Sequence, residues 1–198
     1  MPRALSELLY DVRWALAGGL GPRDLIPMLE HLVRATQADT PDGLFARQQL
    51  SELLLERAPW RAARLATEVL QHEDDHPAWA VLGLAHTLLG HYRSAARAFR
   101  AAVARSPGTA SYHHNLGHLM DVAMGRPARA LPSLQRAIRL APTDVEIAAS
   151  YAHALRGVGR EGEALRVLRQ ALRDDARAAA VLERWVERAA SPVGGSAS

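Results

Sequence analysis

The sequence predicts an all-α chain built as a stack of helix-turn-helix hairpins. Apolar residues recur at helical rather than alternating spacing, and no strand pattern is found along the chain. Of the 198 residues, 48% are hydrophobic but only 5% are aromatic, as is typical of helices rich in Ala and Leu. Residue types also recur about every 34 residues, which stacked helical hairpins require.

Residues 1–40 predict an N-terminal helical pair. Residues 4–16 form the first helix, which Gly18 and Gly19 end, and residues 23–37 form the second, in which Pro27 is tolerable only in the first turn. The pair either caps the stack or joins two copies of the chain into a dimer. The first helix carries the side chains for either role: Leu5, Leu8, Leu9, Val12, Trp14, Ala15 and Leu16.

A degenerate hairpin is expected at residues 42–75. The segment from Trp60 to Leu65 resembles the segment from Tyr92 to Arg97, which lies in a clearer repeat, and Ala58-Pro59 breaks the chain just before it. The leading helix of this hairpin is apolar enough to be buried.

Three clear hairpins follow at residues 76–109, 110–144 and 145–175. We expect the middle copy, which is one residue longer, to hold its extra residue between its two helices, near 124–127. The matching positions are Trp79, Leu82, Gly83, Ala95, Phe99, Ala102 and Pro107; then Leu116, Gly117, Ala130, Leu134, Ala137 and Pro142; then Tyr151, Ala152, Gly159, Ala164, Leu168 and Ala171.

The small residues of this pattern have a mechanical reason. Gly83, Gly117 and Ala152 let the first helix of each hairpin approach the second. Phe99, Leu134 and Leu168 are then expected to fill the gap to the next hairpin. Residues 176–190 predict a terminal capping helix and residues 191–198 a flexible tail, so that the whole forms one continuous domain.

The first clear repeat resembles the tetratricopeptide repeat family. It matches the family pattern W-x2-L-G-x2-Y…A-x3-F…P, with His86 in the place of the Tyr. The resemblance implies a right-handed superhelical stack, an α-solenoid, whose concave groove is lined by the first helix of each hairpin and holds a peptide. The groove candidates are Ala80, Leu84, Thr87, Ser111, His114, His118, Asp121, Glu146, Ala149, His153 and Arg156.

Histidines in this set have a second interpretation. His114 and His118 are four residues apart on one helical face, Asp121 follows one turn later, and His153 takes the place of His118 in the next repeat. Such a set can hold Zn or Ni, but the spacing is weak evidence and the Glu of an HExxH motif is missing. We therefore expect polar groove residues with pH-sensitive binding and no metal cofactor.

Charge is unevenly distributed. All 24 basic residues in the Lys+Arg count are Arg; residues 1–75 sum to −4 and residues 76–198 to +7. This composition is typical of a GC-rich bacterial genome. The second helices carry a predicted basic ridge on the convex side, which is either a solvated face or a site for an acidic partner, whereas the scarcity of aromatic residues disfavours nucleic acid. The ridge comprises Arg97, Arg100, Arg136, Arg139, Arg166, Arg169 and Arg173.

Catalysis finds little support. The chain contains no Cys, no phosphate-binding glycine loop and no nucleophile elbow. Charged residues Glu7, Asp11 and Arg13 interrupt the N-terminal segment, which therefore predicts neither a signal peptide nor a membrane span, and a cytoplasmic location is expected. The favoured function is a non-enzymatic adaptor that binds a peptide or helix of a partner protein. The alternatives are a chaperone like those of type III secretion, a homodimeric scaffold and a metal-binding protein.

Overall fold

The computed structural model describes residues 5–172, all of whose regular elements are helical. The chain divides into two compact units, Met1–Pro107 and Gly108–Ser198. The predicted capping helix at 176–190, the tail at 191–198 and Arg173 lie outside the described residues.

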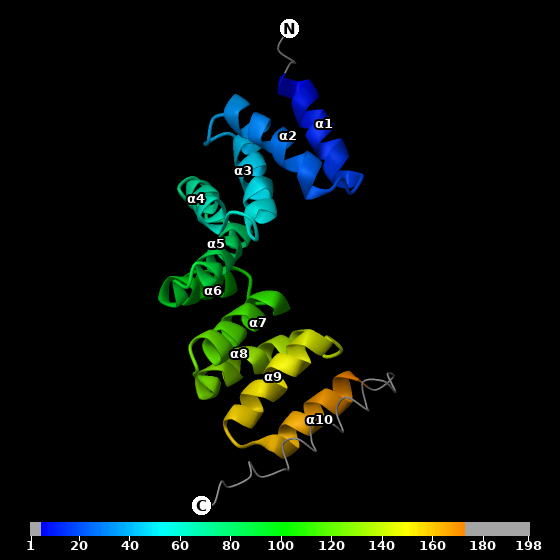
Figure 1. Cartoon of the computed structure of the whole chain (residues 1–198), viewed down its shortest axis with the longest axis vertical. Coiled ribbons are helices and arrows are strands. Elements are labelled where there is room, and N and C mark those ends of the chain that lie inside the picture. Colours follow the sequence, from blue (N-terminus) through cyan, green and yellow to red (C-terminus); the bar gives the residue numbers. More distant parts are fainter. Residues whose placement is uncertain (1–4, 173–198) are drawn as a thin grey trace, which may run out of the picture. The chain divides into compact units, whose positions relative to one another are not determined.

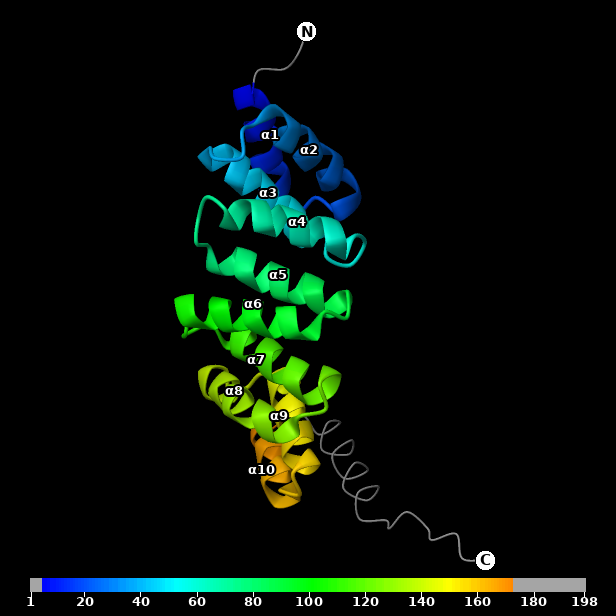
Figure 2. The same ribbon diagram turned by 90° about the vertical axis from the view of Figure 1, so that its left-hand side faces the viewer.

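The first unit contains six helices in its described part (Figure 1), and each packs against the next in sequence. Figure 2 shows α3 to α6 lying one below another. The helices are α1 (Leu5–Ala17), α2 (Pro22–Ala35), α3 (Pro41–Leu54), α4 (Pro59–Leu70), α5 (His76–Leu88) and α6 (Tyr92–Arg105).

The described part of the second unit is a row of two hairpins. Its first hairpin has a π-helical turn, η1, continuous with the first helix. The elements are α7 (Ala110–His118), η1 (Leu119–Ala123), α8 (Pro127–Leu140), α9 (Val145–Gly157) and α10 (Glu161–Ala171).

Helix starts and stops follow local chemistry. The side chains of Thr40, Asp75 and Asp144 accept backbone N–H groups at the starts of α3, α5 and α9. Glycines with positive φ lie in the turn after the first helix of each clear hairpin, where a side chain would be strained. These glycines are Gly90, Gly125 and Gly159.

Pro27 differs from expectation, because it lies inside α2 and beyond its first turn. Proline has no N–H to donate, so the carbonyl of Arg23 lacks its helical partner. Both residues are exposed, and water can therefore solvate that carbonyl. An exposed helix face thus tolerates an unpaired backbone carbonyl that would be costly on a buried face.

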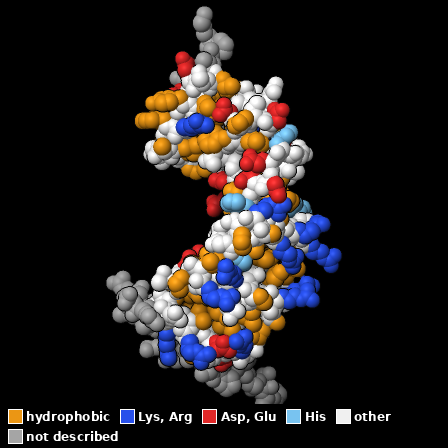
Figure 3. Space-filling model, turned by 180° about the vertical axis from the view of Figure 1, so that it is seen from behind, with side chains coloured by type: hydrophobic (Ala, Val, Ile, Leu, Met, Phe, Trp, Pro, Cys, Tyr) orange, Lys and Arg blue, Asp and Glu red, His pale blue; other side chains and the backbone are white. Residues whose placement is uncertain are grey.

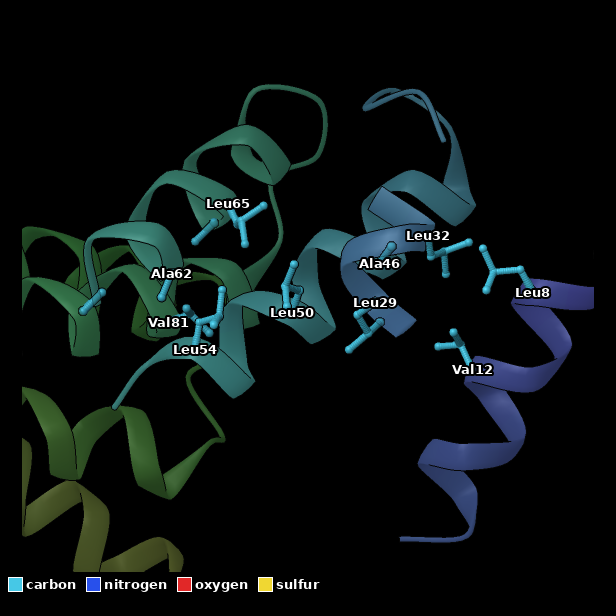
Figure 4. Close-up of a cluster of buried hydrophobic side chains, with 12 residues drawn as sticks. Leu8, Val12, Leu29, Leu32, Ala46, Leu50, Leu54, Ala62, Leu65 and Val81 are labelled. Atoms are coloured by element: carbon cyan, nitrogen blue, oxygen red, sulfur yellow. The ribbon is translucent and has the colours of Figure 1, made fainter. Parts of the chain in front are cut away.

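A single hydrophobic core joins the N-terminal helical pair to the hairpins of the first unit. Leu8 and Val12 of α1 pack with Leu29 and Leu32 of α2, and the cluster continues to Leu50 of α3 (Figure 4). The predicted apolar stripe of the first helix is thus used to cover the neighbouring helices.

Two hairpins, α5–α6 and α7–α8, close at a glycine that the repeat spacing singles out. A Cβ on Gly83 would lie 2.5 Å from the ring of Phe99, and a Cβ on Gly117 would lie 2.5 Å from Cγ of Leu134. Phe99 and Leu134 are both buried, and each lies against the first helix of its own hairpin, whereas the sequence suggested that they fill the gap to the next hairpin. The two helices therefore approach to a distance that leaves no room for a methyl group.

Trp79, the first residue of the family pattern, ties α5 to the segment before it and to α6. Its indole N–H donates to Asp74 Oδ1 at 2.9 Å, Arg105 pairs with the same carboxylate, and the guanidinium lies 5.2 Å from the Trp79 ring centroid. Hydrogen bonds from Arg105 and Trp79 hold the pKa of Asp74 below its ordinary value.

We expect Gly117→Ala to lower the free energy of unfolding by about 1–3 kcal/mol, because the added methyl group overpacks the contact with Leu134. Gly162→Ala is the matched control, since Gly162 also lies in a helix of the second unit and a Cβ there meets nothing within 4 Å. The control should gain about 0.5–1 kcal/mol. Urea unfolding measures both, and equal effects would contradict the close-approach argument.

Candidate functional site

An apolar cavity of about 530 Å³ opens on the first unit between α5 and the end of α3. Two of the predicted groove residues, Leu84 and Thr87, line it, whereas Ala80 is buried and does not. The remaining lining residues are Pro22, Glu52, Leu53, Leu55, Glu56, Arg57 and Leu88. We call this feature the unit-1 cavity.

Leucine side chains make the lining of the unit-1 cavity apolar. Leu88 is 58% exposed and lies four residues after Leu84, so both project from the same side of α5. The Thr87 hydroxyl donates to the carbonyl of Gly83 at 2.8 Å, so its donor is already satisfied within α5. Leu88 was missed in the sequence, although its spacing from Leu84 was the available signal.

Charged side chains surround the cavity. Glu52 accepts a hydrogen bond from Gln48 at 2.7 Å, while Glu56 and Arg57 are exposed and make no side-chain contact recorded within residues 5–172. Figure 3 shows apolar and acidic side chains together over the N-terminal helices, at the top of the view. The apolar lining of the cavity is thus bordered by both acidic and basic side chains.

A second site, which is polar, lies in the second unit where α7 meets α9. His114 Nε2 lies 2.9 Å from Ser150 Oγ, and Ser150 Oγ lies 3.4 Å from His118 Nδ1. A serine hydroxyl has one proton, so Ser150 donates to one ring and accepts from the other. With Asp121 and His153, described next, these residues form what we call the histidine cluster.

Asp121 lies within the π turn and belongs to the histidine cluster. Its side chain is only 4% exposed, and His153 Nδ1 lies 2.6 Å from its Oδ2, while the His153 side chain is 65% exposed. The carboxylate therefore orients the His153 ring, with Nδ1 directed at Asp121 and the rest of the ring open to solvent.

The π turn also accounts for the extra residue of the middle repeat. Gly90 follows Gly83 by seven positions, whereas Gly125 follows Gly117 by eight. The N–H of Met124 bonds the carbonyl of Leu119, five residues back, as in a π-helix. The insertion thus lies within the helix at Leu119–Ala123 and not near 124–127 as the sequence suggested.

The remaining predicted groove residues of the second unit lie around the cluster. Ser111, Glu146, Ala149 and Arg156 are all exposed on α7 and α9. Ser150, in contrast, was not among the predicted residues, because its role depends on which α7 histidines it meets across the hairpins.

Burial lowers the pKa of His114 below its usual value of 6.5. Glu146 acts in the opposite direction through its negative charge, and His118 adds to the lowering. Burial therefore favours the neutral form of the His114 ring, which suits its hydrogen bond with Ser150.

Metal binding gains no geometric support in the described part of the chain. Residues 5–172 contain no group of three or more His, Cys, Asp or Glu side chains arranged to hold a metal ion. The four predicted candidates instead pair internally, His114 and His118 through Ser150 and His153 with Asp121.

Arginines of the predicted basic ridge project from the second helices. Those within residues 5–172 are exposed and form no ion pair with another described residue. Arg97 donates a hydrogen bond to the Ser94 hydroxyl. They are Arg97 and Arg100 on α6, Arg136 and Arg139 on α8, and Arg166 and Arg169 on α10.

No described helix is both long and apolar enough to cross a lipid bilayer.

Comparisons with known proteins agree with the hairpin architecture. The tetratricopeptide repeat family matches residues 76–109 and, separately, residues 121–184. Among curated proteins, FlbA of Caulobacter vibrioides is 34% identical over 113 residues, which are 57% of this chain and 19% of FlbA. The chain therefore corresponds to about a fifth of that bacterial relative.

Solved structures share the fold at low identity. MamA from Desulfovibrio magneticus RS-1 superimposes with a TM-score of 0.70 at 18% identity, covering 97% of this chain and 99% of that one. A thermophilic TPR protein of Thermus thermophilus, TTC0263, gives a TM-score of 0.65 at 20% identity and covers 93% and 100%.

Hairpins that close on a glycine, repeat at 34 or 35 residues and leave their first helices partly exposed define a protein-interaction scaffold. With both repeat matches in place, the chain is a tetratricopeptide repeat protein, as the sequence predicted.

We expect His153→Ala to lower the free energy of unfolding by about 1–2 kcal/mol, because the buried Asp121 carboxylate loses its hydrogen bond. In an Asp121→Ala background the same change should have little effect, so a double-mutant cycle should give a coupling of about 1 kcal/mol. His118→Ala is the control, because it removes the longer contact with Ser150 and a ring contact with His114 but leaves the Asp121–His153 pair in place. Additive effects of the two changes would show that the pair contributes no coupling.

Stability should also fall as the pH drops below about 6.5, where unfolded histidine gains a proton. Because the folded pKa of His114 is lowered, the unfolded chain binds this proton more readily, and stability is lost as the pH falls toward the folded pKa. His114→Gln, which can still hydrogen-bond Ser150, should reduce this loss. Urea unfolding on both sides of that pH measures it, and an unchanged pH dependence would contradict the assignment.

Proposed function

We propose that this chain is a non-enzymatic adaptor that binds a peptide or helix of a partner protein, with the unit-1 cavity as its anchoring site. The observation that carries the proposal is the apolar lining of that cavity, above all the half-buried Leu84 and the exposed Leu88 on α5. Apolar surface left open to water favours a partner that covers it.

The dimensions of the cavity support a side-chain anchor. Its volume of about 530 Å³ lies in the range of specific binding pockets and has room for several large side chains. A helical partner would insert residues from one face at i and i+3 or i+4, whereas an extended partner would insert alternate residues. Both modes need the apolar floor.

The histidine cluster offers the second unit a different kind of contact. The exposed His118 and His153 rings can donate or accept hydrogen bonds, so this face suits polar side chains or backbone groups of a partner. Asp121 fixes the His153 ring beforehand, which lowers the entropy lost on binding.

The test is affinity capture from the native lysate with three double variants, followed by binding of synthetic peptides tiled from the captured protein. We expect Leu84→Glu with Leu88→Glu to weaken peptide binding by about 10-fold or more, because the change places charge on an apolar anchor. Trp60→Glu is the control, since Trp60 is 60% exposed on α4 and does not line the cavity.

Two further variants decide between the surfaces. His118→Ala with His153→Ala tests the histidine cluster, and Arg136→Glu with Arg166→Glu tests the basic ridge. If binding survives the leucine changes but is lost with the arginine changes and in high salt, the partner is acidic and binds the ridge, and the proposed site is wrong.

A further inference from the structure

The outer side of α1 leaves two large aromatic side chains in water. Tyr10 and Trp14 are each 69% exposed and lie four residues apart, while Leu8, Val12 and Ala15 of the same helix face the core. Tyr and Trp are the residues that most often dominate protein interfaces. The inner face of α1 is therefore buried in the core, and its outer face is exposed to solvent.

This outer face has a definite composition. Successive residues of an α-helix are rotated by about 100°, so positions three, four and seven residues from Tyr10 share its side of α1. We call the resulting set the α1 stripe, all of it exposed: Ser6, Glu7, Tyr10, Arg13, Trp14 and Ala17.

The α1 stripe is complementary to itself. Consider two copies of α1 that lie antiparallel and cross at Tyr10. The residue three positions before Tyr10 in one copy then lies opposite the residue three positions after it in the other, so Glu7 faces Arg13. Positions four apart also exchange, and Trp14 then lies over Ser6. A twofold axis thus joins opposite charges twice and sets a large side chain against a small one twice.

We propose that a second copy of this chain docks on the α1 stripe in this antiparallel arrangement. Arg13 is compatible with it: the guanidinium lies 5.3 Å from the Phe45 ring centroid and 3.6 Å from Asp42, yet the side chain is 60% exposed. Its five N–H donors allow a further carboxylate to bind.

The length of α1 sets the strength of this dimer. Thirteen helical residues span only about 20 Å, so the contact buries less than a standard interface of about 1,600 Å². We therefore expect a reversible dimer in the micromolar range. This assembly is independent of the unit-1 cavity, which α1 does not line.

Sedimentation equilibrium of the full chain across the micromolar range tests the proposal. The wild type should show a monomer–dimer equilibrium, which Trp14→Ala should weaken by about 10-fold or more. Trp60→Ala removes an equally large exposed aromatic residue from α4 and should leave the equilibrium unchanged. A wild type that stays monomeric, or a dimer indifferent to Trp14→Ala, overturns the proposal.

Charge exchange tests the antiparallel register. Glu7→Arg places like charges opposite one another in its own dimer, and so does Arg13→Glu, so each variant alone should be monomeric at concentrations where the wild type pairs. An equal mixture of the two restores both opposite-charge pairs and should form the heterodimer. If the mixture associates no better than its components, the register is wrong.

Thermal unfolding of both variants accompanies the experiment, because Arg13 also contacts Phe45 and Asp42 within the chain. If Arg13→Glu fails to fold, Glu7→Arg and Trp14→Ala still decide the outcome, since neither residue has a side-chain partner recorded within residues 5–172.

Discussion

The approach of two helices at a glycine is the constraint on which the rest of this structure depends. At Gly83 and Gly117 the first helix of a hairpin lies against an aromatic ring or a leucine of the second with no space for a methyl group. That contact fixes how each first helix is rotated, and hence which side chains remain outside the hairpin. The leucines of the unit-1 cavity and the residues of the histidine cluster are what is left over once this packing is satisfied.

Much of the fold could be predicted from the sequence, because repeated packing leaves a repeated pattern. The small residues, the large residues that fill against them and the turn glycines recur at fixed offsets, and the structure confirms the helical hairpins. Contacts between neighbouring hairpins leave no such pattern. Ser150, Leu53 and Leu55 gain their roles only from helices elsewhere in the chain, so no periodicity marks them. The expectation that Pro27 must lie in the first turn of its helix was too strict, because water can solvate the carbonyl that loses its helical hydrogen bond.

Arginine takes two different physical roles here. In the described part of the first 75 residues, Arg13, Arg47, Arg61 and Arg64 all form ion pairs with carboxylates. The arginines of the basic ridge have no such recorded partner and stand exposed on second helices. Arg105 and Arg160 form ion pairs as well, so the ridge arginines are distinguished by lacking a carboxylate partner among residues 5–172. The total charge of +3 conceals this difference.

The π turn at Leu119–Ala123 has a consequence for how such a repeat can change over time. One residue inserted into a regular helix would rotate every later side chain by about 100° and ruin the packing of the hairpin. Here the wider turn absorbs the insertion locally, and Ala130 and Leu134 still reach their buried places. A repeat of this kind can therefore accommodate one extra residue in its first helix without redesign of the hairpin that carries it.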